Sequence, residues 1–209
     1  MRMKRYFLRV MTLACLGLLN LGFAHAQNKD TADGLVKFVV EDVMNTIKND
    51  KAIQAGDLRK INTLVDQKIL PYSNFQKTTR LAMGRNWNKA TPAQQEQITQ
   101  EFKNLLIRIY SGALAQVRDQ KIQYKPFRAV ADETDVIVRT VVIGKGEPIQ
   151  IGYRVEKTND GWKVYDINVL GAWLVESYRN QFNDQVSKGG IDGLVQFLQQ
   201  RNAALAAGK

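Results

Sequence analysis

The stretch that decides the fold is PIQIGYRVEKTNDGWKVYDINV, residues 148–169. Up to Glu156, apolar and polar side chains alternate, as in a β-strand with one buried and one solvated face. Residues 158–161 have the composition of a hairpin turn, and a second alternating run comes after them. In that run the apolar phase slips near Tyr165, which predicts a β-bulge that curves the sheet.

Two further runs of β-branched and aromatic residues precede this hairpin, at residues 122–127 and 135–143. The glycine-containing segment 144–147 predicts another tight turn between the second run and the hairpin. We therefore expect an antiparallel sheet of about four strands. The run 135–143 is apolar on nearly both faces, which indicates that other parts of the chain cover each side of it.

Three helices are expected before residue 91, because apolar residues recur there with the spacing of an amphipathic helix. The first spans residues 31–49. Asp57 is a suitable N-cap for the second helix, and Pro71 ends it. The third covers residues 75–83.

A long helix is expected to begin at TPAQ, residues 91–94, and to continue to about Val117. This motif supplies a capping Thr, a proline in the first turn and a Gln that can bond back to the cap. After the strands, helices at about 172–186 and 191–202 flank a break at Gly189-Gly190. The order of elements predicts an α+β domain in which helices pack on one face of a curved sheet.

The N-terminal segment has the three-part layout of a secretory signal peptide. Four basic residues and no acid precede an apolar run over residues 10–23, and Ala24-His25-Ala26 comes next. We expect cleavage of residues 1–26, which leaves residues 27–209 as a single exported domain. The alternative, a lipid anchor on Cys15, is disfavoured because the apolar run continues past the cysteine.

Export changes the chemistry that is open to the chain, because its one cysteine and one histidine, Cys15 and His25, lie in the expected signal peptide. Without them the mature chain has no thiolate, no imidazole base, and no zinc, haem or iron-sulfur site of the usual ligand types. We expect no enzyme activity, cofactor or metal. The formal net charge falls from +10 to +6 on cleavage. The basic residues are scattered singly, which argues against nucleic acid and suits either anionic lipid headgroups or a merely solvated surface.

Two sets of motifs resemble a known family. They are Leu81-Ala82-Met83-Gly84-Arg85-Asn86-Trp87, Thr91-Pro92-Ala93-Gln94-Gln95, Phe102, Leu105-Leu106 and Tyr110, and then Trp162-Lys163-Val164-Tyr165-Asp166-Ile167, Gly171, Tyr178-Arg179, Phe182 and Gly193-Leu194. In order and spacing they resemble the MlaC, or Ttg2-type toluene-tolerance, family of periplasmic phospholipid-binding proteins. The resemblance covers essentially all of the mature chain.

The resemblance implies an NTF2-like α+β fold whose helices and curved sheet enclose an apolar cavity. It also implies a periplasmic carrier that shuttles phospholipid between an inner-membrane ABC transporter complex and an outer-membrane lipoprotein-porin complex, and so maintains outer-membrane lipid asymmetry. The chain departs from the family pattern on both sides of Gly171. Leu170 replaces an expected acid and Trp173 replaces a small hydroxyl residue.

The candidate contacts for acyl chains are apolar residues on elements that are expected to face each other. They are Leu105, Ile109, Tyr110, Val136, Val138, Ile151, Tyr153, Tyr165, Val169 and Trp173. The alternative for each is an ordinary place in the core. For Arg179 the alternatives are a headgroup contact and a structural ion pair, of which we favour the ion pair.

Two other classes of function remain open. One is an enzyme on the same scaffold, with Asp166 or Asp135 as a base whose pKa burial raises. Against this, Asp166 suits a structural hydrogen-bonding role better. The other is a periplasmic adaptor or chaperone that binds a protein segment with an exposed apolar patch.

Overall fold

The computed structural model describes residues 29–130 and 132–208. The expected signal peptide therefore lies outside the described residues. No helix within the described ranges is both long enough and apolar enough to cross a bilayer. In chain order the elements are α1 Ala32–Asn49, α2 Lys51–Gln54, α3 Leu58–Leu64, η1 Val65–Ile69, η2 Leu70–Tyr72, α4 Phe75–Met83, η3 Gly84–Lys89, α5 Pro92–Ala115, β1 Lys121–Tyr124, β2 Asp135–Ile143, β3 Ile149–Thr158, β4 Gly161–Val169, β5 Ala172–Trp173 and α6 Leu174–Ala206.

The sheet has five antiparallel strands in the order β1-β2-β3-β4-β5. The α+β fold and the four expected strands are confirmed, although β1 ends at Tyr124 instead of residue 127. The expected bulge is also confirmed. Arg154 pairs with Asp166 and Val155 pairs with Val164, which leaves Tyr165 as the extra residue.

The fifth strand corrects the prediction that a helix begins at residue 172. Leu170 and Gly171 have φ angles of 53° and 93°, so the chain turns back in a two-residue hairpin before α6 begins. Farther along, the predicted break is present, because Gly189 and Gly190 have non-helical backbone angles inside α6. The helix beyond that break continues to Ala206.

The predicted helix caps are present in the structure. The Asp57 carboxylate accepts from the backbone N–H groups at the start of α3. Thr91 and Gln94 form the reciprocal capping box at the start of α5. These local bonds fix where each helix begins, and so they fix which side chains face inward.

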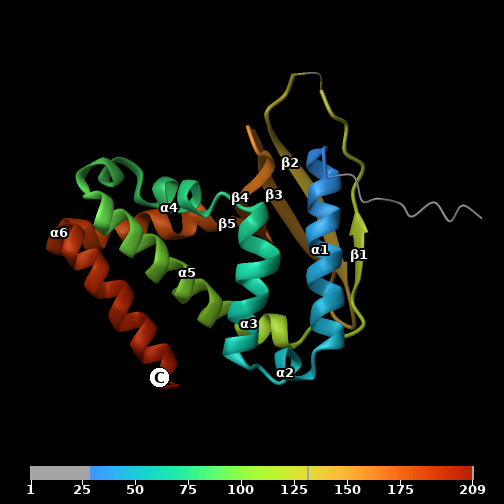
Figure 1. Cartoon of the computed structure of the whole chain (residues 1–209), viewed down its shortest axis with the longest axis horizontal. Coiled ribbons are helices and arrows are strands. Elements are labelled where there is room, and N and C mark those ends of the chain that lie inside the picture. The colour runs from blue at the N-terminus through green and yellow to red at the C-terminus, as the bar shows by residue number, and fades with distance from the viewer. Residues whose placement is uncertain (1–28, 131, 209) are drawn as a thin grey trace, which may run out of the picture.

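One face of the sheet, which we call the inner face, is covered by α1. Val136, Val138 and Val155 on this face form a buried cluster with Leu35 and Val36 of α1. Figure 1 shows α1 running across the strands in front of the sheet. Burial of these side chains stabilises the sheet half, by about 25 cal/mol for each Å² of apolar area removed from water.

Helix α4 lies on the opposite, outer face, so the prediction that helices pack on one face is wrong. Asn74 and Lys77 both reach Glu156, whose side chain points away from α1. The reason is that the chain crosses the edge of β4, where Ser73 forms a parallel bridge with Val164. Beyond this crossing the chain builds a helical half beside the sheet (Figure 1).

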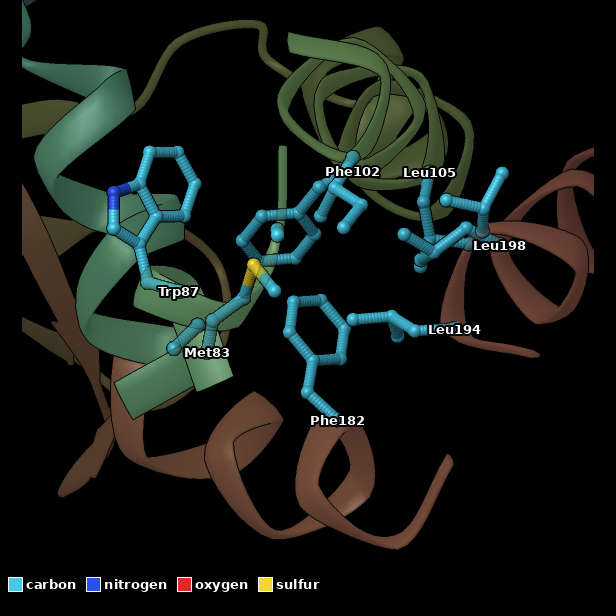
Figure 2. Close-up of a cluster of buried hydrophobic side chains, with 11 residues drawn as sticks. Met83, Trp87, Phe102, Leu105, Phe182, Leu194 and Leu198 are labelled. Carbon is cyan, nitrogen blue, oxygen red and sulfur yellow. The ribbon is translucent and has the colours of Figure 1, made fainter. Parts of the chain in front are cut away.

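The core of the helical half is centred on Phe102 of α5. Its ring centroid lies 5.6 Å from that of Phe75, 4.8 Å from that of Tyr178 and 5.0 Å from that of Phe182. Figure 2 shows Phe102 and Phe182 in this core together with Met83 of α4, Trp87 of η3, and Leu194 and Leu198 from the second part of α6. The rings meet mostly edge to face, the geometry that aromatic pairs prefer.

Helix α5 joins this core to a third one. Farther along α5, Ile107 is buried with Ile47 at the end of α1 and Ile61 of α3. The same helix therefore packs on α4 and α6 through one face and on α2 and α3 through another.

Candidate functional site

The candidate site begins with the C-terminal half of α5, where large apolar side chains are only partly packed on the neighbouring helices. Phe102 faces α6 and Ile107 faces α3, and each helical residue advances about 100°, so Leu106 and Tyr110 lie between these two directions. Tyr110 is nevertheless 46% exposed, and the adjacent Ile109 is 40% exposed. Large apolar side chains therefore remain unburied along the C-terminal half of α5.

A second unburied apolar surface lies at the end of the inner face, where β3 begins and β4 ends. Ile149 is 39% exposed and Val169 is 43% exposed. Leu170 at the tip of the β4–β5 hairpin is 70% exposed, and its backbone N–H donates to the carbonyl of Gln150. The apolar inner face thus continues past the part that is packed against α1.

Five of the predicted lipid contacts lie in or beside packed layers. Leu105 belongs to the helical core, and Val136 and Val138 belong to the core under α1. Tyr153 packs against that same core, and Ile151 comes next on the inner face, opposite Val169. The structure therefore brings the predicted residues of β2 and β3, together with Val169 of β4, onto one face of the sheet, to which Ile109 and Tyr110 of α5 do not belong.

Two predicted contacts, Tyr165 and Trp173, point elsewhere. The Tyr165 hydroxyl lies 2.8 Å from one carboxylate oxygen of Asp135 and donates to it on the outer face. The Trp173 ring lies 4.0 Å from the guanidinium carbon of Arg154, also on the outer face. The bulge moves Tyr165 out of the alternation, and β5 carries Trp173 to the outer side, neither of which the sequence pattern indicates.

Asp166 is structural, as predicted. Its carboxylate accepts from the backbone N–H groups of Ile167 and Val175 at 2.9 and 3.1 Å, and from Arg154 at 2.9 Å. Burial raises the pKa of this carboxyl, while the two N–H groups and the guanidinium act in the opposite direction. The bonds to Val175 and Ile167 fix the start of α6 to β4.

The ion pair that we favoured for Arg179 is not what the structure contains. Its Nε donates to the carbonyl oxygen of Leu81 at 3.2 Å, which joins α6 to α4. A backbone acceptor is an alternative that residue types alone do not reveal, because every residue carries a carbonyl.

The inner face carries a cluster of three hydroxyl groups that the sequence pattern does not predict, those of Tyr124, Thr140 and Tyr153, although Tyr153 itself is a predicted contact. Tyr124 lies directly opposite Thr140, and the Thr140 and Tyr153 hydroxyl oxygens are 3.4 Å apart. Burial is the main cause that raises the pKa of both tyrosines. Only the strand register shows that these polar groups share a face that is otherwise apolar.

The outer face carries a different kind of hollow, of about 550 Å³. Gly152 forms part of its floor, and a Cβ there would lie 3.3 Å from Asn168 and 3.5 Å from Trp173. Lys125 and Arg139 supply positive charge at its wall. Its lining mixes these cations and amide groups with apolar side chains such as Ile137, Val141 and Trp173, whereas the inner face offers apolar surface with few polar groups. We therefore take the inner face as the better candidate for a lipid.

Fold and site together define an α+β, NTF2-like domain with apolar surface left open at the end of its sheet and along one helix. The chain belongs to the MlaC protein family, whose model matches residues 37–200. It is 25% identical over 170 residues to the intermembrane phospholipid transport system binding protein MlaC of Haemophilus influenzae, with 79% of each chain covered. It is also 29% identical over 104 residues to the toluene tolerance protein ttg2D of Pseudomonas putida, covering 50% of this chain and 48% of that one.

A solved structure is similar over most of the chain. It is the phospholipid-binding protein from Ralstonia solanacearum in complex with a phospholipid. The sequence identity is 58% and the TM-score is 0.82, with 84% of this chain and 98% of that chain covered. The resemblance to the family is thereby confirmed at the level of both sequence and fold.

Proposed function

We propose that this chain is a periplasmic phospholipid carrier that shuttles lipid between an inner-membrane ABC transporter complex and an outer-membrane complex, and so maintains outer-membrane lipid asymmetry. The observation that carries the proposal is the 58% identical Ralstonia protein, whose structure is a complex with a phospholipid. The name of the Haemophilus relative, a phospholipid transport system binding protein, supports the transport role. The signal-like N-terminus supports the periplasm.

The physical chemistry of the ligand explains why a carrier is needed. A two-chain phospholipid has roughly 30 methylenes, whose exposure to water would cost on the order of 24 kcal/mol. Unaided escape over such a barrier is very slow. A carrier therefore loads and unloads while docked, with the tails passing between apolar openings, and this mechanism needs no catalytic side chain.

The proposed acyl-chain contacts are the members of our predicted set that the structure leaves within reach of a ligand. Ile151, Tyr153 and Val169 supply the inner-face surface, and Ile109 and Tyr110 supply the surface of α5. Leu105, Val136 and Val138 lie at the back of the packed layers and would be reached only by the ends of the chains.

The test is native mass spectrometry, with lipid extraction in parallel, on the mature protein purified from a periplasm without detergent. Phospholipid is expected at near-stoichiometric amounts. A lipid-free protein that also takes up no lipid from vesicles would contradict the carrier proposal and favour the adaptor alternative.

A matched pair of variants shows whether the inner-face surface holds the lipid. Val169→Asp places a charge at the proposed contact and should lower lipid occupancy several-fold, because a carboxylate is poorly compatible with acyl chains. Val130→Asp makes the same change at a residue that is 64% exposed in the loop before β2, and it should leave occupancy unchanged. Equal loss in both variants would argue against this location.

A further inference from the structure

A cluster of three hydroxyl groups lies beneath α1 on the inner face. Tyr124 of β1 is directly opposite Thr140 of β2, and Tyr153 of β3 is the diagonal neighbour of Thr140. The Thr140 and Tyr153 hydroxyl oxygens are 3.4 Å apart, so one can donate to the other while the acceptor's own hydrogen stays free. The neighbouring side chains on this face are apolar, among them Val136 and Val138, so the three hydroxyl groups are surrounded by apolar surface.

The Tyr124 hydroxyl is the unsatisfied member of this cluster. Its oxygen is shielded from solvent and has no hydrogen-bond partner in the part of the chain that the structure describes. The charged groups that face it come from α1. Lys37 lies 5.9 Å from the ring centroid and can only donate, and Glu41 acts on the hydroxyl electrostatically without bonding to it. A buried hydroxyl without a hydrogen-bond partner is unfavourable, so such groups usually have a use.

A fatty acyl group has one feature that matches this hydroxyl. The methylenes of the acyl chain form no hydrogen bonds, but its carbonyl oxygen can accept one. An acceptor of this kind is what the unpaired Tyr124 O–H needs. The inner face supplies the apolar surface for the chain, and Tyr124 supplies the donor for the carbonyl. Thr140 and Tyr153 offer a second donor beside it, because one hydrogen of their shared pair remains free.

We propose that Tyr124, Thr140 and Tyr153 form an acyl-carbonyl subsite in which the Tyr124 hydroxyl donates a hydrogen bond to the carbonyl oxygen of a bound fatty acyl group. The inference rests on the proposed phospholipid-binding function and adds a specific polar contact to it. The carbonyl can belong to the ester of a phospholipid or to a free fatty acid.

The experiment is a competition between two phosphatidylethanolamines of equal chain length, one diester and one diether, read by native mass spectrometry of the purified mature protein. The wild type should load the diester about three- to tenfold more than the diether, the range of one neutral hydrogen bond. Tyr124→Phe keeps the ring and removes only the hydroxyl, so its preference should fall to about one. Tyr72→Phe, at a ring that packs on Phe38, is the matched control and should keep the wild-type preference.

The outcomes separate this inference from the function it rests on. Loading of both lipids without preference by the wild type, or a preference that persists in Tyr124→Phe, would overturn the subsite alone. Failure to load either lipid would overturn the carrier function together with the subsite. Oleate added as a third competitor shows whether a free acid displaces the diester through the same hydroxyl, in which case Tyr124→Phe weakens both.

A second readout covers the case in which the variant does not fold. In wild-type protein labelled with ¹³C at the tyrosine Cζ, one resonance should shift when the diester is loaded and stay in place when the diether is loaded. Identical spectra for the two lipids would overturn the subsite.

Discussion

At the scale of single residues, Leu170 combines backbone strain with exposure. Its φ of 53° is unfavourable for a leucine, and the first position of a two-residue hairpin with such angles prefers Asn. Leu170→Asn should therefore raise the free energy of unfolding by about 0.5–1 kcal/mol, measured by urea unfolding. Leu58→Asn, at an exposed leucine that begins α3, removes a similar side chain without relieving strain and should give no gain. A loss of stability in Leu170→Asn would mean that the leucine makes a stabilising contact.

Residue types predict some roles and leave others out of reach. Asp166 as a hydrogen-bonding group is expected from its place in a strand beside an apolar run, and the structure confirms it. The Arg179 contact with a backbone carbonyl and the hydroxyl cluster at Tyr124 could not be predicted in this way. Both depend on which strands and helices become neighbours, and that information is spread over residues far apart in the chain.

At the scale of elements, α4 is attached to the sheet through a shielded polar cluster. The Lys77 side chain is only 16% exposed, pairs with the 18% exposed Glu156, and lies 3.6 Å from the Tyr165 ring centroid. Lys77→Met leaves Glu156 with Asn74 as its bonded partner and should destabilise the fold by about 2 kcal/mol. The double variant with Glu156→Gln should recover part of that loss, because the unpaired charge is then gone. Urea unfolding of the four proteins measures the coupling, and additive losses would show that the pair contributes nothing.

Helix caps and the β-bulge could be predicted from the sequence, because each depends on residues that are close together in the chain. The caps at Asp57 and Thr91 and the bulge at Tyr165 each depend on residues within a few positions, and each is present in the structure. The two-residue strand β5 is too short to show a period, so the pattern after Leu170 predicts the start of a helix and not a hairpin. Which face of the sheet α4 covers depends on where the chain crosses the edge of β4, at Ser73. The spacing of apolar residues along the sequence does not indicate this crossing.

At the scale of the whole molecule, the chain forms two halves that share α5 and the polar attachment of α4. One half is the sheet with α1 on its inner face, and the other is the bundle of α4, α5 and α6 (Figure 1). The unburied apolar surfaces lie at the end of the first half and along the helix that joins the two.

Alkaline pH tests how the two interiors hold together, because each contains buried tyrosines. Burial raises the pKa of Tyr178 in the helical half to about 12, and it also raises the pKa of Tyr124 and Tyr153 in the sheet half. In the unfolded chain a tyrosine titrates near pH 10. Between about pH 10 and 12 the unfolded state therefore loses protons that the folded state keeps, so stability falls as the pH rises, by up to about 1.4 kcal/mol per unit for each group.

Tyr178→Phe removes one of these groups, so its stability should decline less steeply than that of the wild type. Urea unfolding gives the difference in free energy of unfolding between the two proteins. The value at pH 8 is the reference, because at that pH neither the folded nor the unfolded state loses a tyrosine proton. At pH 11.5 that difference should move in favour of the variant by about 1 kcal/mol, less than the full value because the ring is only partly shielded. A difference that is the same at both pH values would mean that the hydroxyl reaches water in the folded protein, and the helical half would then be open along the side of α5 that carries Tyr110.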